Sequence, residues 1–296
     1  MEIILGLATA LCWGAGDFLA RSIAQRLGSY RALLLVQLVG GAALSAYLLL
    51  SGELARLISA APHSAWAWAV LGALLNLTGS LFLYRAFEVG VLALVSPIGS
   101  SYAAVTVALS LLSGETVGRG QALGMALTLL GVILAVGLQG EPPDAPPAPI
   151  QEGVPRDARK GVIFALIAAA GYGMAFWVLG YHVTGQLGGT APVWVVRLVT
   201  IATLAALATP LRQRLRVPRT AGLWGPIAVV GLLDTGGYLA FAHAMHGDQI
   251  AIVGVLSSLF SAVTVLLSWI FLRERLAASQ WLGIVVIFAG VALVSA

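Results

Sequence analysis

The sequence predicts an all-α membrane protein with ten transmembrane helices in two inverted five-helix repeats. Three observations predict this fold. Hydrophobic residues make up 59% of the 296-residue chain and charged residues only 9%, whereas about 25% of the residues of an ordinary soluble protein are charged. Apolar runs of about 20 residues, the length that crosses about 30 Å of hydrocarbon, recur along the whole chain. The second half of the chain also repeats the first.

The apolar runs define ten predicted spans. They cover residues 3–20, 32–50, 66–84, 92–112, 121–138, 161–180, 192–210, 224–243, 251–271 and 280–295. Most connecting loops are short, so neighbouring spans are expected to be antiparallel. The exception, 139–160, holds six of the twelve prolines and is typical of an extended, solvated linker. We therefore predict a first repeat at 1–138, a linker at 139–160 and a second repeat at 161–296.

The internal repeat is visible when the two halves are aligned at an offset of 158 residues. LLNLTGSLFLYRA (74–86) then lies over LLDTGGYLAFAHA (232–244), and the run AVTV is identical at 104–107 and 262–265. Because each half holds an odd number of spans, the two halves must cross the membrane in opposite directions. Such an inverted repeat is typical of secondary transporters.

The distribution of charge predicts the orientation and excludes some partners. The loops after the odd-numbered spans hold 13 of the 16 Lys and Arg residues, so we expect these loops in the cytoplasm and both termini outside. The net charge of +4 comes without a basic cluster on a soluble domain, so no nucleic-acid partner is expected. Cys12 is the only cysteine, which excludes a disulfide framework and a cysteine metal site. We expect no metal, no cofactor, and a multi-pass monomer or weak dimer in the cell inner (plasma) membrane.

Several motifs resemble those of a known family. They are WGAGDFLAR (13–21), the paired AVTV runs, GE and RE at 114–115 and 273–274, and GQALGMALTLLGVILAVG (120–137) with its copy at 279–296. Through them, essentially the whole chain resembles the EamA family of the drug/metabolite transporter superfamily. The resemblance implies ten helices in two inverted halves and the export of small metabolites, often amino acids. Among the members of this family, the chain is expected to be most similar to an exporter of aromatic amino acids.

Asp234 is the sharpest candidate for a transport residue. It lies about ten residues into the span 224–243, near the bilayer centre, where a carboxylate costs roughly 2.5–3.5 kcal/mol on insertion scales. Its copy in the first half is Asn76. The inverted repeat thus places two polar residues near the midplane, where such transporters bind substrate. We predict that both line a cavity; the alternative is a protonated or paired aspartate that locks helices together.

Further charged or titratable side chains lie in the spans or at their ends. Arg197, the only arginine inside a span, is predicted to bind a substrate carboxylate, to pair with Asp234 or to snorkel to the interface. His243 is predicted to contact substrate and relay protons, or else to lie at the interface. Asp17, four residues before Arg21, is predicted to form an ion pair at a helix end or to act in gating.

Aromatic and hydroxyl side chains complete the predicted binding site. Tyr172 lies over Trp13 of the first half. Tyr172 is predicted to line a wall for a planar substrate, with aromatic filling as the alternative, whereas Trp13 lies near a span end and fits an interfacial belt. Tyr238, one turn beyond the central aspartate, is also predicted to contact substrate. Ser100 and Ser258 occupy equivalent positions of the repeat and are predicted to hydrogen-bond a ligand or a neighbouring helix.

Glycines and one proline are predicted to shape the helices. Gly236 and Gly237 favour close packing, a hinge or exposure of the backbone to a ligand, and Gly79 is the copy of Gly237. Pro97 removes a backbone hydrogen bond from the span 92–112 and is predicted to kink it as a hinge. Two glycine pairs, each seven residues apart, are predicted to join the two halves as scaffold: Gly124 with Gly131, and Gly283 with Gly290.

The predicted function is secondary transport by alternating access through a cavity between the repeats. The expected substrates are small metabolites, amino acids and aromatic ones in particular, and the expected direction is export. The alternative is a proton-coupled multidrug exporter of lipophilic cations, in which Asp234 exchanges protons for substrate. HExxH, GxSxG and P-loop motifs are absent from the sequence, so an enzyme is not expected.

Overall fold

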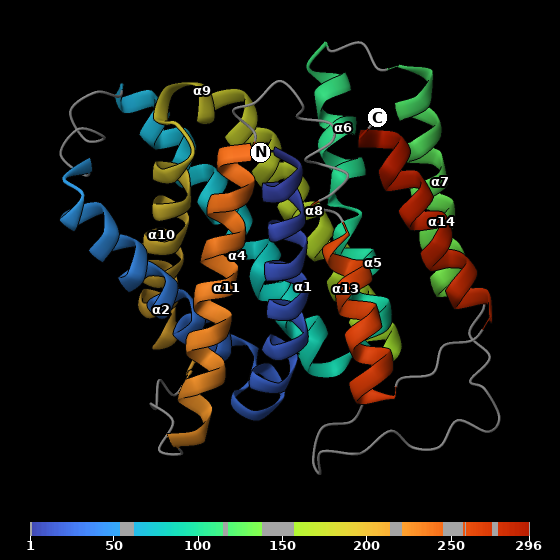
Figure 1. Cartoon of the computed structure of the whole chain (residues 1–296), viewed down its shortest axis with the longest axis horizontal. Helices are drawn as coiled ribbons and strands as arrows, with labels where there is room; N and C mark the ends of the chain where they lie inside the picture. The colour runs from blue at the N-terminus through green and yellow to red at the C-terminus, as the bar shows by residue number, and fades with distance from the viewer. Residues whose placement is uncertain are drawn as a thin grey trace.

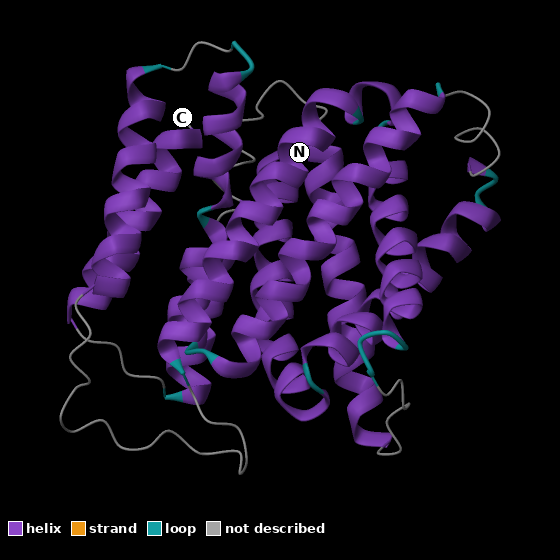
Figure 2. Cartoon of the chain, turned by 180° about the vertical axis from the view of Figure 1, so that it is seen from behind, coloured by secondary structure: helices purple, strands orange, loops and turns teal. Residues whose placement is uncertain are grey.

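The structure of the protein is a computed structural model that describes residues 2–53, 62–114, 118–137, 157–213, 221–244, 257, 259–273 and 278–295. Every regular element in these ranges is helical (Figure 2). Five helices are long and apolar enough to cross a membrane: α2 (Ser29–Leu50), α4 (His63–Val89), α8 (Ala158–His182), α10 (Thr190–Ala208) and α11 (Trp224–Ala244). Most of the predicted linker 139–160 lies outside the described residues.

Most of the other described helices fall on the remaining predicted spans. The other helices are α1 (Glu2–Leu27), α5 (Leu92–Ser100), α6 (Tyr102–Leu112), α7 (Arg119–Gly137), the short α9 (Thr184–Leu187), the 3-10 turn η1 (Ala221–Leu223), α13 (Phe260–Leu267), its π-helical extension η2 (Ser268–Leu272) and α14 (Ala278–Ser295). Of these, α9 and η1 lie in loops between predicted spans. Figure 1 shows that α1 begins and α14 ends at the same end of the bundle, as an even number of crossings requires. Ten crossings stay a prediction.

The two halves of the chain interlock through equivalent helix pairs. The first helix of the first half, α1, packs along α11 of the second half, and its counterpart α8 packs along α4 of the first. The last helices of the halves, α7 and α14, pack against each other and stand at one side of the bundle (Figures 1 and 2). Each half therefore depends on the other for its burial, and the chain folds as one unit.

The repeated AVTV runs make the same joint twice. The hydroxyl of Thr106 donates to the carbonyl of Gly173 at 3.0 Å, and that of Thr264 donates to the carbonyl of Gly14 at 3.1 Å. A Cβ added to either glycine would lie 2.5 Å from the Cβ of the valine that precedes the threonine. We call these contacts the two AVTV joints. They fix α6 on α8 and α13 on α1, which explains why the run is identical in both halves.

The glycine faces of α7 and α14 join the halves, as predicted. A Cβ added to Gly131 would lie 2.6 Å from the backbone nitrogen of Ile287, and one added to Gly290 would lie 2.5 Å from that of Thr128. Real Cβ atoms do not approach backbone this closely, so only glycine allows the two helices to pack at this separation.

The predicted span 92–112 is two helices rather than one kinked helix. The break comes at Ser101, four residues after Pro97, which lies inside α5. The hydroxyl of Ser100 donates to the carbonyl of Pro97 at 2.8 Å, and that of Ser101 donates to the next carbonyl at 2.7 Å. The two serines thus satisfy carbonyls that the helix leaves open at its end. The following helix begins at Tyr102.

Candidate functional site

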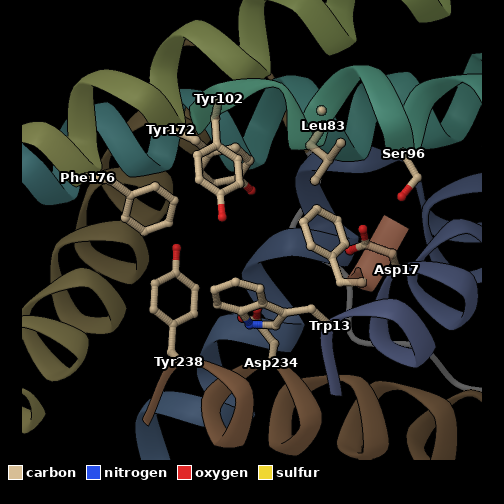
Figure 3. A pocket seen from close by; sticks show the side chains of 11 residues that line it. Trp13, Asp17, Leu83, Ser96, Tyr102, Tyr172, Phe176, Asp234 and Tyr238 are labelled. Carbon is tan, nitrogen blue, oxygen red and sulfur yellow. The ribbon is translucent and has the colours of Figure 1, made fainter. Parts of the chain in front are cut away.

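A pocket opens where seven helices converge: α1, α4, α5, α6, α8, α11 and α13 (Figure 3). It is lined mainly by aromatic rings together with two aspartates, and we call it the aromatic pocket. The lining residues are Trp13, Asp17, Leu83, Ser96, Gly99, Tyr102, Tyr172, Phe176, Asp234, Tyr238 and Phe260. The centre of a water molecule can occupy about 60 Å³ of it, which is room for a few waters.

A second, smaller cavity adjoins the aromatic pocket. The centre of a water molecule can occupy about 40 Å³ of it, and it shares Asp17 and Asp234 with the larger pocket. It extends towards Gln37 and Ser80. The two carboxylates therefore border both cavities, and a group that enters either one meets them.

The aromatic rings of the pocket contact one another around its walls. The centroid of Trp13 lies 5.2 Å from that of Tyr238, in an edge-on arrangement, and 5.9 Å from that of Phe260. On the other side, the centroids of Tyr102 and Phe176 are 4.9 Å apart. These separations are typical of attractive aromatic pairs. The rings hold each other in place and present flat apolar surface to a ligand.

Two of these rings rest on glycines of the opposing helix. A Cβ added to Gly237 would lie 2.6 Å from the ring of Trp13, and one added to Gly79 would lie 2.9 Å from the ring of Tyr172. Trp13 and Tyr172 are equivalent in the repeat, as are the two glycines. Gly237 is therefore a packing position, and α11 continues unbroken through it and through Gly236. A hinge at these glycines stays a prediction.

Arg197 forms an ion pair with Asp234. Its Nη1 lies 2.5 Å from Oδ2 of Asp234 and 2.5 Å from Oε1 of Gln37, to which it also donates. Arg197 and Gln37 are equivalent in the repeat, so this hydrogen bond links the two halves. The guanidinium also lies 5.2 Å from the ring centroid of Tyr238. Of the roles predicted for Arg197, the pair with Asp234 is the one that the structure shows.

The two partners of this ion pair are not equally buried. The side chain of Arg197 is 1% exposed, whereas that of Asp234 is 28% exposed and lines the pocket. Arg197 lies behind Asp234 rather than in the lining. Its role is therefore to hold and neutralise that carboxylate, and a ligand in the pocket meets Asp234 first.

A chain of four polar side chains links the repeats beside the pocket. Nδ2 of Asn76 donates to Oη of Tyr238 at 2.5 Å, and Oγ of Ser80 donates to Oδ1 of Asn76 at 3.4 Å. Oη of Tyr172 donates to Oγ of Ser80 at 3.1 Å. We call these four residues the polar chain. Asn76 is buried behind Tyr238 and does not line the aromatic pocket, so its part is to position the tyrosine.

Asp17 lies in the pocket wall and not at a helix end. The prediction ended the first span at residue 20, but α1 continues to Leu27 because Ile23, Ala24 and Leu27 of its last turns pack into the core. Among the ion pairs between described residues, none joins Asp17 to Arg21. Asp17 lines both cavities, and in the part of the chain that the structure describes its carboxylate has no hydrogen-bond or ion-pair partner.

Six pocket residues were not singled out by the sequence: Leu83, Ser96, Gly99, Tyr102, Phe176 and Phe260. Trp13, which was expected in an interfacial belt, also lines the pocket. Ser96 has a buried hydroxyl with no hydrogen-bond partner among the described residues. Tyr102 and Phe260 are each the first residue of a helix and occupy equivalent positions of the repeat. Phe176 lies one turn beyond Tyr172 on α8. The one-turn spacing from Tyr172 could have indicated from the sequence that Phe176 faces the pocket. The repeat alignment could have paired Tyr102 with Phe260.

The remaining predicted site residues do not line the pocket. Ser100 is buried between α5 and α13, where it accepts a hydrogen bond from Ser261 at 3.2 Å. His243 is exposed in the last turn of α11, with Nδ1 2.7 Å from the carbonyl of Leu239. The helix carries it past the pocket because it lies more than one turn beyond Tyr238. Ser258 lies outside the described residues.

Comparison with known proteins identifies the family. A model described as the EamA-like transporter family matches residues 1–137 and 159–296. The chain belongs to this family. It is a multi-pass membrane protein and, at the level of the family, a transporter of small metabolites and not an enzyme. The two matched segments are the two halves that the aromatic pocket lies between.

Two further comparisons support the repeat and the fold. A protein of Methanocaldococcus jannaschii that is described as uncharacterized is 34% identical over 133 residues, which are 45% of this chain and 93% of that protein. Nearly all of the relative therefore matches less than half of this EamA-like chain, a length close to one repeat. A crystal structure of another protein superposes with a TM-score of 0.63 at 18% identity, over 99% of this chain and 95% of that chain. At this identity the likeness concerns the fold alone.

Proposed function

We propose that this EamA-like transporter exports small metabolites that carry an ammonium group, and that amino acids, including aromatic ones, are its substrates. The observation that carries the proposal is the position of Asp17, an acid without a described partner in a pocket whose walls are aromatic. Aromatic faces and a carboxylate both attract an ammonium group. The same rings offer apolar surface to the rest of an aromatic substrate.

The charges around the pocket support a substrate that carries an ammonium group. Arg197 neutralises Asp234 by direct contact, which leaves Asp17 without a counterion among the described residues. A bound ammonium group would supply that counterion. A polyanion such as a phosphate ester would meet carboxylate and no cation among the described lining residues, so we do not propose this class.

The size of the pocket supports alternating access. Space for a few water molecules is smaller than an aromatic amino acid, so helices must separate to admit one. The two AVTV joints hold equivalent helix pairs and provide a matched place for such movement on either side of the pocket. We propose that the protein works as a secondary transporter of the cell inner membrane. We propose that it works as a monomer or weak dimer.

Export of lipophilic cations is the second candidate function. Asp17 in an aromatic pocket also suits a cation without a carboxylate. If protons drive this exchange, the structure favours Asp17 over Asp234 as the residue that alternates between proton and substrate, because Asp234 is already paired with Arg197. A requirement for a carboxylate on the substrate distinguishes the two candidates.

The test is counterflow in proteoliposomes with and without a pH gradient. The panel contains labelled phenylalanine, leucine, phenethylamine and tetraphenylphosphonium. We expect uptake of phenylalanine, loss of that uptake in Asp17→Asn, and unchanged uptake in Glu53→Gln, which removes a carboxylate far from the pocket lining. Transport of no panel member, or full activity of Asp17→Asn, would contradict the proposal.

A further inference from the structure

We infer that the hydroxyl of Tyr238 donates the hydrogen bond that holds the carboxylate of the substrate, with the hydroxyl of Tyr102 as a second donor. This inference rests on the proposed transport of amino acids and adds to it the residues that recognise the acid group. It also gives a reason why the pocket prefers an amino acid to a lipophilic cation.

The hydrogen bonds of the polar chain leave one hydroxyl hydrogen over. Each tyrosine and serine hydroxyl has one hydrogen to donate. Tyr172 gives its hydrogen to Ser80, and Ser80 gives its hydrogen to the carbonyl oxygen of Asn76. The amide nitrogen of Asn76 then donates to Tyr238. The oxygen of Tyr238 is an acceptor in this bond, so its own hydrogen remains for another partner.

Reversing the amide of Asn76 does not remove the spare donor. In that arrangement Tyr238 donates to Asn76, Asn76 donates to Ser80, and Ser80 donates to Tyr172. The spare hydrogen then belongs to Tyr172, which lines the same pocket. When each hydroxyl both accepts and donates along the chain, one phenol hydrogen is left over at an end. The amide of Asn76 turns its nitrogen towards Tyr238 in the structure, which places the spare hydrogen on Tyr238.

Tyr102 contributes a second hydroxyl at the same part of the pocket. It lines the pocket, and its hydroxyl has no hydrogen-bond partner within the described ranges. Figure 3 shows the hydroxyl groups of Tyr102 and Tyr238 both directed into the space between the rings. A carboxylate has two oxygens that each accept hydrogen bonds. Two phenol donors therefore match one carboxylate.

The other unpaired donors near the pocket are less suited to this role. Nε1 of Trp13 has no accessible surface, and it lies against Gly237, where an added Cβ would be 2.7 Å away. The free nitrogens of Arg197 are likewise inaccessible behind Asp234. The hydroxyl of Ser96 is also covered. Among the donors of the described lining residues, the tyrosine hydroxyls are the ones that point into the open space of the pocket (Figure 3).

The test compares two ligands that differ by the carboxylate. Phenethylamine is phenylalanine without its acid group, so a residue that binds the carboxylate should affect phenylalanine alone. Binding of both is measured by calorimetry on purified wild-type protein and on Tyr238→Phe and Tyr102→Phe. Tyr47→Phe, on the exposed face of α2, is the matched control. Melting temperatures confirm that each variant is folded.

We expect Tyr238→Phe to weaken phenylalanine binding about tenfold, as for a hydrogen bond to a charged group, and to change phenethylamine binding less than twofold. Tyr102→Phe should act in the same direction. Equal weakening of both ligands would show that Tyr238 only supports the pocket, and would overturn the inference, as would unchanged binding of both. Wild-type protein that binds phenethylamine but not phenylalanine would overturn the inference and leave the cation exporter. Wild-type protein that binds neither would reject the proposed function itself.

Discussion

Neutralising Asp234 should destabilise the protein more than neutralising Arg197, although the two side chains form one ion pair. Asp234→Asn leaves a guanidinium that is 1% exposed with uncharged partners and no carboxylate among the described residues, and an uncompensated buried charge costs about 3–5 kcal/mol. Arg197→Gln leaves a carboxylate that faces the pocket and is 28% exposed. Water in the pocket can solvate that carboxylate, so the loss is about 1–2 kcal/mol.

Thermal unfolding of the purified protein in one detergent measures this difference. A change of 1 kcal/mol moves Tm by about 2 °C in a chain of this size. We therefore expect Tm to fall by about 6–10 °C in Asp234→Asn and by about 2–4 °C in Arg197→Gln. The double variant should lose less than Asp234→Asn alone, because it leaves no buried charge.

The reasoning depends on the unequal burial of the two partners, and the order of the three variants tests it. An Arg197→Gln variant that loses as much Tm as Asp234→Asn would refute it. A double variant whose loss equals the sum of the single losses would show that the two side chains do not interact.

Five other single-residue variants, of three kinds, have outcomes that follow from described contacts. Thr106→Val and Thr264→Val should each lower Tm by about 2 °C, by the same amount, because each removes one hydrogen bond of an AVTV joint. Gly290→Ala should destabilise the α7–α14 pair by about 1–3 kcal/mol in a thermal shift assay, while Gly236→Ala, which has open space at its Cβ, should not destabilise. The N-cap hydrogen bond from a backbone N–H to Asp157 lowers the pKa of that carboxyl. The stability that Asp157 contributes is therefore fully present above the ordinary carboxyl pKa. It is lost as the pH falls through the lowered pKa of Asp157 in the folded protein. The Tm difference between wild type and Asp157→Ala should therefore shrink in acid.

The internal repeat made much of the scaffold predictable. Residues that stayed identical in both halves, such as Thr106 and Thr264, make the same backbone contact twice. The glycines of α7 and α14 likewise pack backbone against backbone. A contact of this kind tolerates little change in side-chain size, so the residue that makes it can be recognised in the sequence. The pairing of Asp234 with Arg197 was also among the alternatives that the chemistry of the two residues offered.

The pocket was less predictable because it depends on seven helices at once. The hydropathy of the first span ends near residue 20, and Asp17 therefore looked like part of a helix end. Only the packing of α1 against its neighbours shows that the helix continues and that Asp17 faces inwards. His243 and Ser100 have suitable chemistry, but the rotation of α11 and the hydrogen bonds of α5 direct them elsewhere. The sequence of a single helix does not show which of its polar residues lines a pocket, because the pocket is formed by other helices as well.

The two halves share their scaffold and differ in their pocket, and this division has a mechanical consequence. The AVTV runs and the glycines of the α7–α14 contact are identical between the halves, whereas residues that line the aromatic pocket differ from their repeat equivalents: Trp13 from Tyr172, Asp17 from Phe176, Tyr238 from Ser80, Asp234 from Asn76, and Tyr102 from Phe260. In the proposed mechanism, the AVTV joints open on one side of the pocket or the other at similar free energy, because each breaks the same contacts. The pocket holds one acid without a described partner, Asp17, together with the phenol donors, so we propose that a substrate keeps one orientation whichever side is open. We therefore propose that the duplicated scaffold allows access to alternate between the two sides of the membrane. The residues by which the two halves differ in the pocket select the substrate.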